Sequence, residues 1–196
     1  MSLPVLLAIV CSTRPGRVGR PIGDWFVAAA SAVGTFDVRL VDLAELNLPL
    51  MDEPKHPRLH AYTHEHTKAW SRTVAGADAV VWVQPEYNFS MCAPQKNAID
   101  YLAIEWSLLP TGFVSYGGIS GGLRGMEHAK QPLAAVRSVF ANPNVAVPMG
   151  PSMVSDGTFT PPEPVEKSVA PMLADLATLH GALGDARREK LAPLGY

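Results

Sequence analysis

The stretch from Ala79 to Asp100 constrains the fold more than any other part of the sequence. It begins with an apolar run to Val83, and the valines in this run are typical of a strand buried on both faces. Pro85 predicts the end of that strand, because proline cannot donate to a sheet ladder. A helical pattern starts at Ala93, so a polar and aromatic loop lies between strand and helix. In open α/β sheets, ligands bind at such loops.

A second strand–loop–helix unit lies at the amino end, where the loop 11–20 follows an apolar strand at 5–10. Its chemistry is typical of phosphate binding: Ser12 and Thr13 offer hydroxyl groups, Arg14 and Arg17 offer charge, and a helix amino end follows. The loop matches neither a Walker A sequence nor the G-x-G-x-x-G fingerprint, so ATP and classical dinucleotide binding are disfavoured. A basic surface turn is the alternative interpretation.

A third unit contains the strand 112–116 and the loop 117–122, in which four of six residues are glycine. Such a loop can bring backbone amides against a planar ligand, although a merely flexible turn has the same composition. The full pattern predicts strands at 5–10, 36–43, 79–83, 112–116 and 144–148 and helices at 21–33, 63–75, 93–104, 123–139 and 165–183.

Three ordered motifs resemble the NADPH-dependent FMN reductases, a family of flavodoxin-like quinone, azo and chromate reductases. The most specific motif is Pro85-Glu86-Tyr87-Asn88-x-Ser90 followed by Lys96-Asn97-Ala98-Ile99-Asp100. The loop 11–20 resembles the family's phosphate loop, with Cys11 in the usual glycine position, and the loop 115–122 resembles its S-Y-G-x-x-G-G segment. Two further departures are Cys92, where the family commonly has proline, and Gln95, where it commonly has leucine.

The alternation of strands and helices predicts an α/β fold with a parallel sheet and helices on both faces. Together with the resemblance, it predicts a flavodoxin-like three-layer fold, a five-stranded sheet of order 2-1-3-4-5, and a single FMN-binding domain over residues 1–196. This order brings strands 1, 3 and 4 side by side, so we expect their carboxyl-end loops to surround one crevice.

The resemblance implies FMN as cofactor and NADPH or NADH as co-substrate. The residues that it implies around the phosphate are Ser12, Arg14, Arg17, Val18 and Gly19, the last two through backbone groups. Those that it implies around the isoalloxazine are Pro85, Glu86, Tyr87, Asn88 and Ser90, with backbone N–H groups near N5 and O4, and at the pyrimidine edge Ser115, Gly117 and Gly118. No side chain is assigned as catalytic, because flavin N5 carries the hydride and a quinone or similar small acceptor takes it in a ping-pong cycle.

Other functions stay open at this point. An FMN-binding electron carrier or redox sensor would share the motifs, although a carrier is expected to be more acidic than the net charge of −2. A hydrolase or transferase lacks a visible nucleophile arrangement, and an interaction protein that has lost its cofactor is the residual case. The charge disfavours nucleic acid and anionic membranes as partners, and the family implies a homodimer or homotetramer.

Several smaller features also give expectations. Two cysteines without a disulfide or metal spacing fit a cytoplasmic protein. Asp42 is expected to cap or end a strand rather than to bind a ribose. The histidines at 56, 60, 64 and 66 allow a metal site, a substrate or subunit contact, or simple solvation, and no metal site is assigned. A charged, partly mobile tail is expected from Gly184.

Overall fold

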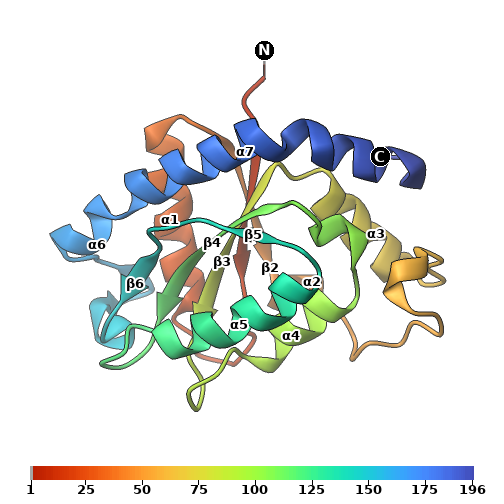
Figure 1. Ribbon diagram of the computed structural model, residues 1–196. Helices are drawn as coiled ribbons and strands as arrows, with labels where there is room; N and C mark the ends of the chain where they lie inside the picture. Colours follow the sequence, from red (N-terminus) through yellow and green to blue (C-terminus); the bar gives the residue numbers. More distant parts are fainter. Residues whose placement is uncertain (1) are drawn as a thin grey trace.

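A parallel sheet lies at the centre of the computed structural model, which describes residues 2–196 (Figure 1). Its strand order is β2-β1-β3-β4-β5, and β6 pairs with the carboxyl half of β4. Every residue of β3 and β4 is buried, as the apolar runs predict. The strands are β1 (Val5–Val10), β2 (Asp37–Asp42), β3 (Ala79–Pro85), β4 (Pro110–Tyr116), β5 (Val139–Phe140) and β6 (Val145–Val147). The predicted flavodoxin-like α/β fold is therefore confirmed.

Helices cover both faces of the sheet (Figure 1). They are α1 (Gly19–Val33), α2 (Leu43–Leu46), α3 (Glu65–Ala75), α4 (Ala93–Asp100), α5 (Leu123–Ala135), α6 (Glu163–Lys167) and α7 (Val169–Leu191). Single 3-10 turns connect them at η1 (Pro57–Leu59), η2 (Ile104–Trp106), η3 (Gly150–Met153) and η4 (Ala192–Leu194), and β7 (Val154–Ser155) pairs with β8 (Thr158–Phe159). None of the helices described for residues 2–196 has both the length and the apolar character needed to cross a membrane.

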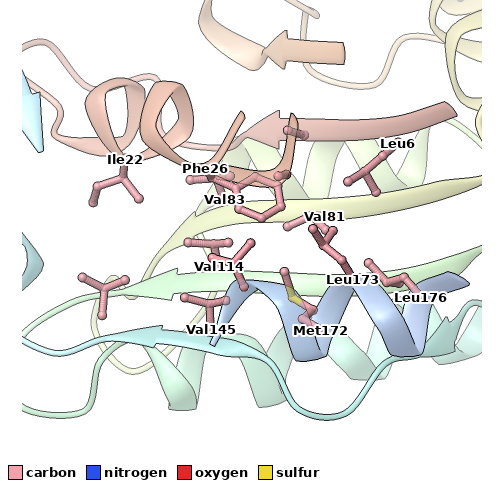
Figure 2. Close-up of a cluster of buried hydrophobic side chains, with 14 of the residues drawn as sticks. Leu6, Ile22, Phe26, Val81, Val83, Val114, Val145, Met172, Leu173 and Leu176 are labelled. Carbon is pink, nitrogen blue, oxygen red and sulfur yellow. The ribbon is translucent and has the colours of Figure 1, made fainter. Parts of the chain in front are cut away.

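Each face of the sheet has its own hydrophobic core. On one face, Ile22 and Phe26 of α1 and Met172 and Leu173 of α7 pack against the strands (Figure 2). Gly112 of β4 permits this close approach, because a Cβ there would lie 3.0 Å from the sulfur of Met172. The opposite core combines side chains of α3, α4 and α5 with the strands, among them Trp70, Trp82, Ile99, Trp106 and Leu133. The two cores fix the sheet and hold the loops at its carboxyl edge in place.

Several element boundaries differ from the prediction. Helix α4 ends at Asp100 rather than 104, and α5 ends at Ala135, after which 139–140 form β5. The fifth strand expected at 144–148 is present as β6, and β5 is an additional short strand where the end of a helix was expected. The proline at 143, which lacks an N–H group, lies between β5 and β6. The expected last helix at 165–183 is two helices, α6 and α7. Gly76 does end α3, and Pro94 does lie in the first turn of α4.

The expectation of a mobile tail from Gly184 is wrong, because α7 continues to Leu191. Arg187 explains the extension. Its guanidinium is buried and donates hydrogen bonds to the carbonyl oxygens of Glu105, Ser107 and Val74, at 2.6, 3.0 and 3.1 Å. Burial lowers the pKa of Arg187 to about 10. A residue predicted to be solvated thus fastens the last helix to the protein.

Candidate functional site

The loop after β1 places an open helix end at the carboxyl edge of the sheet. Helix α1 begins at Gly19 with Val18 as its N-cap, and it has neither a side-chain cap nor an acidic residue in its first turn. Within the described part of the chain, no acceptor contacts the backbone N–H groups of Val18, Gly19 and Arg20. Unpaired donors at the positive end of a helix dipole form a binding site for an anion. This geometry suits a phosphate group.

The arginines of this loop differ in their partners. Arg14 is exposed, and it forms no ion pair with any residue of the described chain. Arg17 lies 2.5 Å from a carboxylate oxygen of buried Asp42, and Arg20 contacts the same oxygen at 3.4 Å. The other oxygen of Asp42 accepts the N–H of Ala44 and caps α2, which confirms the expected capping role. Arg14 is thus free to meet a ligand, whereas Arg17 is already neutralised.

Tyr116, the last residue of β4, adds a group that the sequence analysis did not single out. Its hydroxyl is buried and makes no hydrogen bond with the residues described. A Cβ at Gly19 would lie 2.3 Å from this hydroxyl, so the glycine lets the start of α1 approach the tyrosine. Burial raises the pKa of Tyr116 well above its usual value, which keeps the hydroxyl protonated as a donor. A buried donor without a partner beside an anion site is consistent with a bound ligand.

The loop after β3 forms a tight turn beside the first loop. Tyr87 and Ser90 exchange backbone hydrogen bonds of 2.9 and 3.0 Å, and Asn88 and Phe89 between them have φ of 50° and 67°. Positive φ at both central residues is the requirement of a type I′ turn. The hydroxyl of Tyr87 lies 2.6 Å from that of Ser12, which joins this loop to the first loop. The structure thus brings together two motifs that are 75 residues apart.

Glu86 connects the second loop to the third. Its carboxylate accepts hydrogen bonds from the Ser120 hydroxyl at 2.9 Å and from the Arg124 side chain and backbone at 2.7 and 3.0 Å. Burial raises the pKa of Glu86, but the hydrogen bonds from Arg124, Ser120 and the Gly125 amide outweigh burial and leave the pKa below its usual value. The side chain therefore remains an ionised structural link, and a lowered pKa does not suit a general acid.

Two backbone amides of the second loop are also engaged within the protein. The Glu86 N–H donates to the carbonyl of Tyr116 at 2.9 Å, and the Tyr87 N–H donates to Ser90. Pro85, the last residue of β3, has no N–H group. The segment 85–88 is the one expected to face flavin N5 and O4 with backbone amides. Within it, the N–H of Asn88 has no acceptor among the described residues and is free for a ligand.

The loop after β4 is held by its own hydrogen bonds. The Ser115 hydroxyl donates to the carbonyl of Gly121 at 2.9 Å, and the carbonyl of Gly118 accepts the N–H groups of Gly121 and Met149. Gly122 has a φ of 82°, and a Cβ there would lie 2.6 Å from the nitrogen of Tyr116. At Gly118, by contrast, a Cβ would meet nothing within 4 Å. The loop is rigid at its base and open at Gly118, while Gly117 packs between Glu86 and Gly122.

The residues that depart from the family pattern are neighbours below the site. The Cys92 thiol donates to the carbonyl of Cys11 at 3.4 Å, and both side chains are buried. Burial raises the pKa of both thiols, that of Cys92 to about 11, so neither is a ready nucleophile. Gln95 lies on the same side and donates to Gln84 at 2.7 Å. All three departures thus concern packing beneath the loops.

The histidines between 56 and 66 contact nearby protein groups, and the rings of His64 and His66 also stack with centres 5.1 Å apart. His56 accepts the N–H of Arg58, His66 lies 2.9 Å from a carboxylate oxygen of Asp52, and His60 lies 3.4 Å from Glu105. Residues 2–196 include no group of three or more His, Cys, Asp or Glu side chains arranged to hold a metal ion.

Together, the three loops provide what a phosphorylated flat ring needs. The open amides of α1 and the free Arg14 suit a dianionic phosphate, and the unpartnered hydroxyl of Tyr116 lies buried beneath the start of α1. Tyr87, with 38% of its side chain exposed, and the open backbone of Gly118 suit a planar ring. The residues present therefore fit FMN.

Comparison with known proteins places residues 4–152 in the sequence model of the NADPH-dependent FMN reductases. This range contains all three loops. An NAD(P)H-dependent FMN reductase of Schizosaccharomyces pombe is 42% identical over 121 residues, which cover 61% of this chain and 60% of that protein. An NAD(P)H-dependent FMN reductase of a Nectria species is 33% identical over 141 residues, which cover 69% of this chain and 70% of that protein. The matched region thus spans 60% of the length of the first relative and 70% of the second.

Solved structures of oxidoreductases share the fold of this chain. The flavoenzyme NAD(P)H:(acceptor) oxidoreductase FerB from Paracoccus denitrificans superimposes with a TM-score of 0.71 at 20% identity, over 92% of this chain and 98% of that one. An azoreductase from Bacillus anthracis gives a TM-score of 0.54 at 15% identity, over 91% of this chain and 99% of that one. At such identities these likenesses concern the fold alone.

Proposed function

Because the chain belongs to the NADPH-dependent FMN reductase family, we propose that it is an FMN-dependent NAD(P)H oxidoreductase that reduces a quinone or similar small acceptor. The observation that carries the proposal is the open amino end of α1, which lies beside Arg14 and the unpartnered hydroxyl of Tyr116. The amides and Arg14 present donors to an anion, and the Tyr116 hydroxyl lies buried directly beneath Gly19. We also propose that residues 1–196 form a single FMN-binding domain.

The proposed roles follow the contacts of each residue. Ser12, Arg14 and the amides of Val18 and Gly19 would hold the phosphate, and Arg17 would support them from its ion pair with Asp42. The residues proposed to line the ring are Pro85, Tyr87, Asn88, Ser90, Ser115, Gly117 and Gly118, and Glu86 is proposed to support them. Glu86 acts through the loop after β4, whose position it fixes, rather than by touching the ring.

When bound, FMN supplies a ring nitrogen, N5, that accepts a hydride from NADPH or NADH and returns the electrons to the acceptor. The protein's own contribution is binding and orientation. The loops after β1 and β4 hold the two ends of the cofactor site, and the turn 87–90 borders it between them. Since NAD(P)H and the acceptor would both need access to the same ring, we expect them to enter in turn, which is a ping-pong cycle.

Exposed apolar side chains on the loops at the carboxyl edge of the sheet support a homodimer or homotetramer. Ile119, Phe89, Met149 and Leu123 are exposed by 92%, 61%, 50% and 45%. Ile119 follows Gly118, whose carbonyl accepts the Met149 amide, and Phe89 lies under Arg124 with 3.7 Å between guanidinium and ring centre. Exposed apolar groups gathered on one edge are typical of a contact surface. The cytoplasmic location stays a prediction.

Anaerobic reduction tests the proposed activity. The FMN-loaded protein is mixed with NADPH or NADH, and the flavin absorbance is followed before and after addition of a soluble quinone. We expect bleaching by the nicotinamide, recovery with the quinone, and parallel double-reciprocal plots in steady state. FMN binding without bleaching would contradict a reductase and support the electron carrier or sensor. Intersecting plots would contradict the ping-pong order alone.

A further inference from the structure

We infer that a second cavity, at the amino edge of the sheet, binds a small amphiphilic anion. The cavity has a volume of about 610 Å³ and lies between the segment before β4, the end of α5 and the end of α7. Apolar side chains line part of it, among them Ile104, Val136 and Leu194. Its volume is in the range of cavities that bind small molecules. Because β4 separates it from the loops at the carboxyl edge, the inference does not depend on flavin binding.

Three cations line the same cavity: Arg58, Arg137 and Lys190. None of them forms an ion pair within the described residues. Other lysines and arginines of the chain form ion pairs, as Lys96 does with Asp100. No carboxylate side chain lines the cavity, so its positive charge is not compensated from within. This charge favours an anion and disfavours a metal ion or an amine.

The charge of the adjoining surface is mixed. A neighbouring cavity of about 510 Å³ shares Arg58 with the first and adds Lys55, but the carboxylates of Glu53 and Asp100 also line it. A cavity of about 280 Å³ shares Leu194 with the first and adds Arg72, which forms no ion pair among the described residues. The uncompensated positive charge is therefore clearest in the first cavity, and the expected site is limited to it.

Ser107 provides the second, independent observation. Its side chain is 3% exposed and lines the cavity, yet its hydroxyl has no hydrogen-bond partner among the described residues. A buried hydroxyl without a partner is unfavourable, because it has lost its hydrogen bonds to water and gained none. The next residue, Leu108, donates its N–H to the carbonyl of Arg137 at 2.9 Å, so the serine and the arginine lie on segments joined to each other. An acidic group bound in the cavity would accept hydrogen bonds from the Ser107 hydroxyl and the Arg137 guanidinium.

The apolar and the cationic side chains of the cavity together indicate the class of ligand. The apolar walls suit a hydrocarbon chain, and the unpaired cations and the Ser107 hydroxyl suit one anionic group at the end of that chain. A carboxylate or sulfonate on a chain of about ten carbons meets both requirements and fits the volume. Decanoate is therefore a suitable probe, and decanol, which has the same chain without the charge, is its matched control.

Calorimetric titration of the full-length, FMN-loaded protein tests the inference. We expect decanoate to bind and decanol to bind at least about tenfold more weakly, because cations next to an apolar surface favour the charged group. The double variant Arg137→Gln/Lys190→Gln should raise the Kd for decanoate about tenfold, and Ser107→Val should raise it a few-fold. Higher salt should weaken binding to the wild type.

Arg188→Gln is the matched control variant. Arg188 lies on α7 two residues before Lys190, but it is exposed and paired with Asp185. Its loss should leave the Kd for decanoate unchanged. Equal affinity for decanoate and decanol, an unchanged Kd in the double variant, or no binding of decanoate would overturn the inference. Thermal unfolding of each variant identifies any change of folding, since these side chains contact no loop of the flavin site.

Discussion

The loops after β1 and β4 both lie at the carboxyl edge of the sheet, but they use their polar groups in opposite ways. The first leaves the amides of Val18 and Gly19 without acceptors in the described chain. The second closes on itself through the bonds from Ser115 and Gly121 to loop carbonyls, and Glu86 holds its far end. The sequence left a merely flexible turn open as an alternative for the glycine-rich loop. The structure indicates that the first loop is prepared for a ligand, while the second is a fixed part of the frame.

The strongest test of a fixed second loop is Gly122→Ala. Its φ of 82° and a Cβ position 2.6 Å from the backbone nitrogen of Tyr116 leave no space for a side chain. We expect a loss of about 3 kcal/mol or more in the free energy of unfolding, measured with urea. Gly118→Ala is the control: a Cβ there meets nothing within 4 Å, so its loss should stay below about 1 kcal/mol. Similar losses in both variants would mean that the second loop is not fixed.

Removing the charge of Glu86 should have the next largest effect. Glu86→Gln weakens the bonds to Arg124 and Ser120, and we expect a loss of about 2 kcal/mol in the free energy of unfolding at pH 7. The folded pKa of Glu86 lies below its usual 4.5. Its stabilisation is therefore fully present above about pH 4.5 and is lost as the pH falls through the folded pKa. Unfolding from pH 7 to pH 3 should show the two proteins converging, and a constant gap would contradict this link.

A smaller effect is expected when the charge of the first loop is changed. Arg14→Gln should raise the Kd for FMN about tenfold without altering the stability of the apoprotein, because Arg14 has no protein partner in the described chain. Arg17→Gln is the contrasting variant, since it leaves buried Asp42 without its close partner and should lower apoprotein stability. If Arg14→Gln weakened riboflavin as much as FMN, the loop would not bind the phosphate.

The smallest expected effect concerns the turn between the two loops. Phe89 has a φ of 67°, which strains any residue other than glycine or asparagine by about 1–2 kcal/mol. Phe89→Gly removes this strain but also the contact with Arg124, worth about 0.5–1 kcal/mol. We expect a net stabilisation of about 0.5 kcal/mol, measured by thermal unfolding. A destabilisation would show that the aromatic contact outweighs the strain.

The sequence predicted the sheet order and the three loops because each depends on local patterns: a buried apolar run, a strand-ending proline, and a helix start. It could not predict partners that are distant along the chain. Arg17 looked free until folding brought it to Asp42, 25 residues away. Arg187 looked solvated until α3 and the segment before β4 supplied carbonyl acceptors. Tyr116 was visible as part of a motif, but its unpartnered hydroxyl depends on the close approach of Gly19.

The central claim is that the first loop binds a phosphate group while the other loops hold the ring. Comparing the affinities of the apoprotein for FMN and riboflavin, by flavin fluorescence under identical conditions, tests it most directly. The two ligands share the ring and differ only in the phosphate. The open amides of α1 and Arg14 predict that FMN binds at least about a hundredfold more tightly. Equal affinities would contradict the account, because the first loop would then contribute nothing to binding.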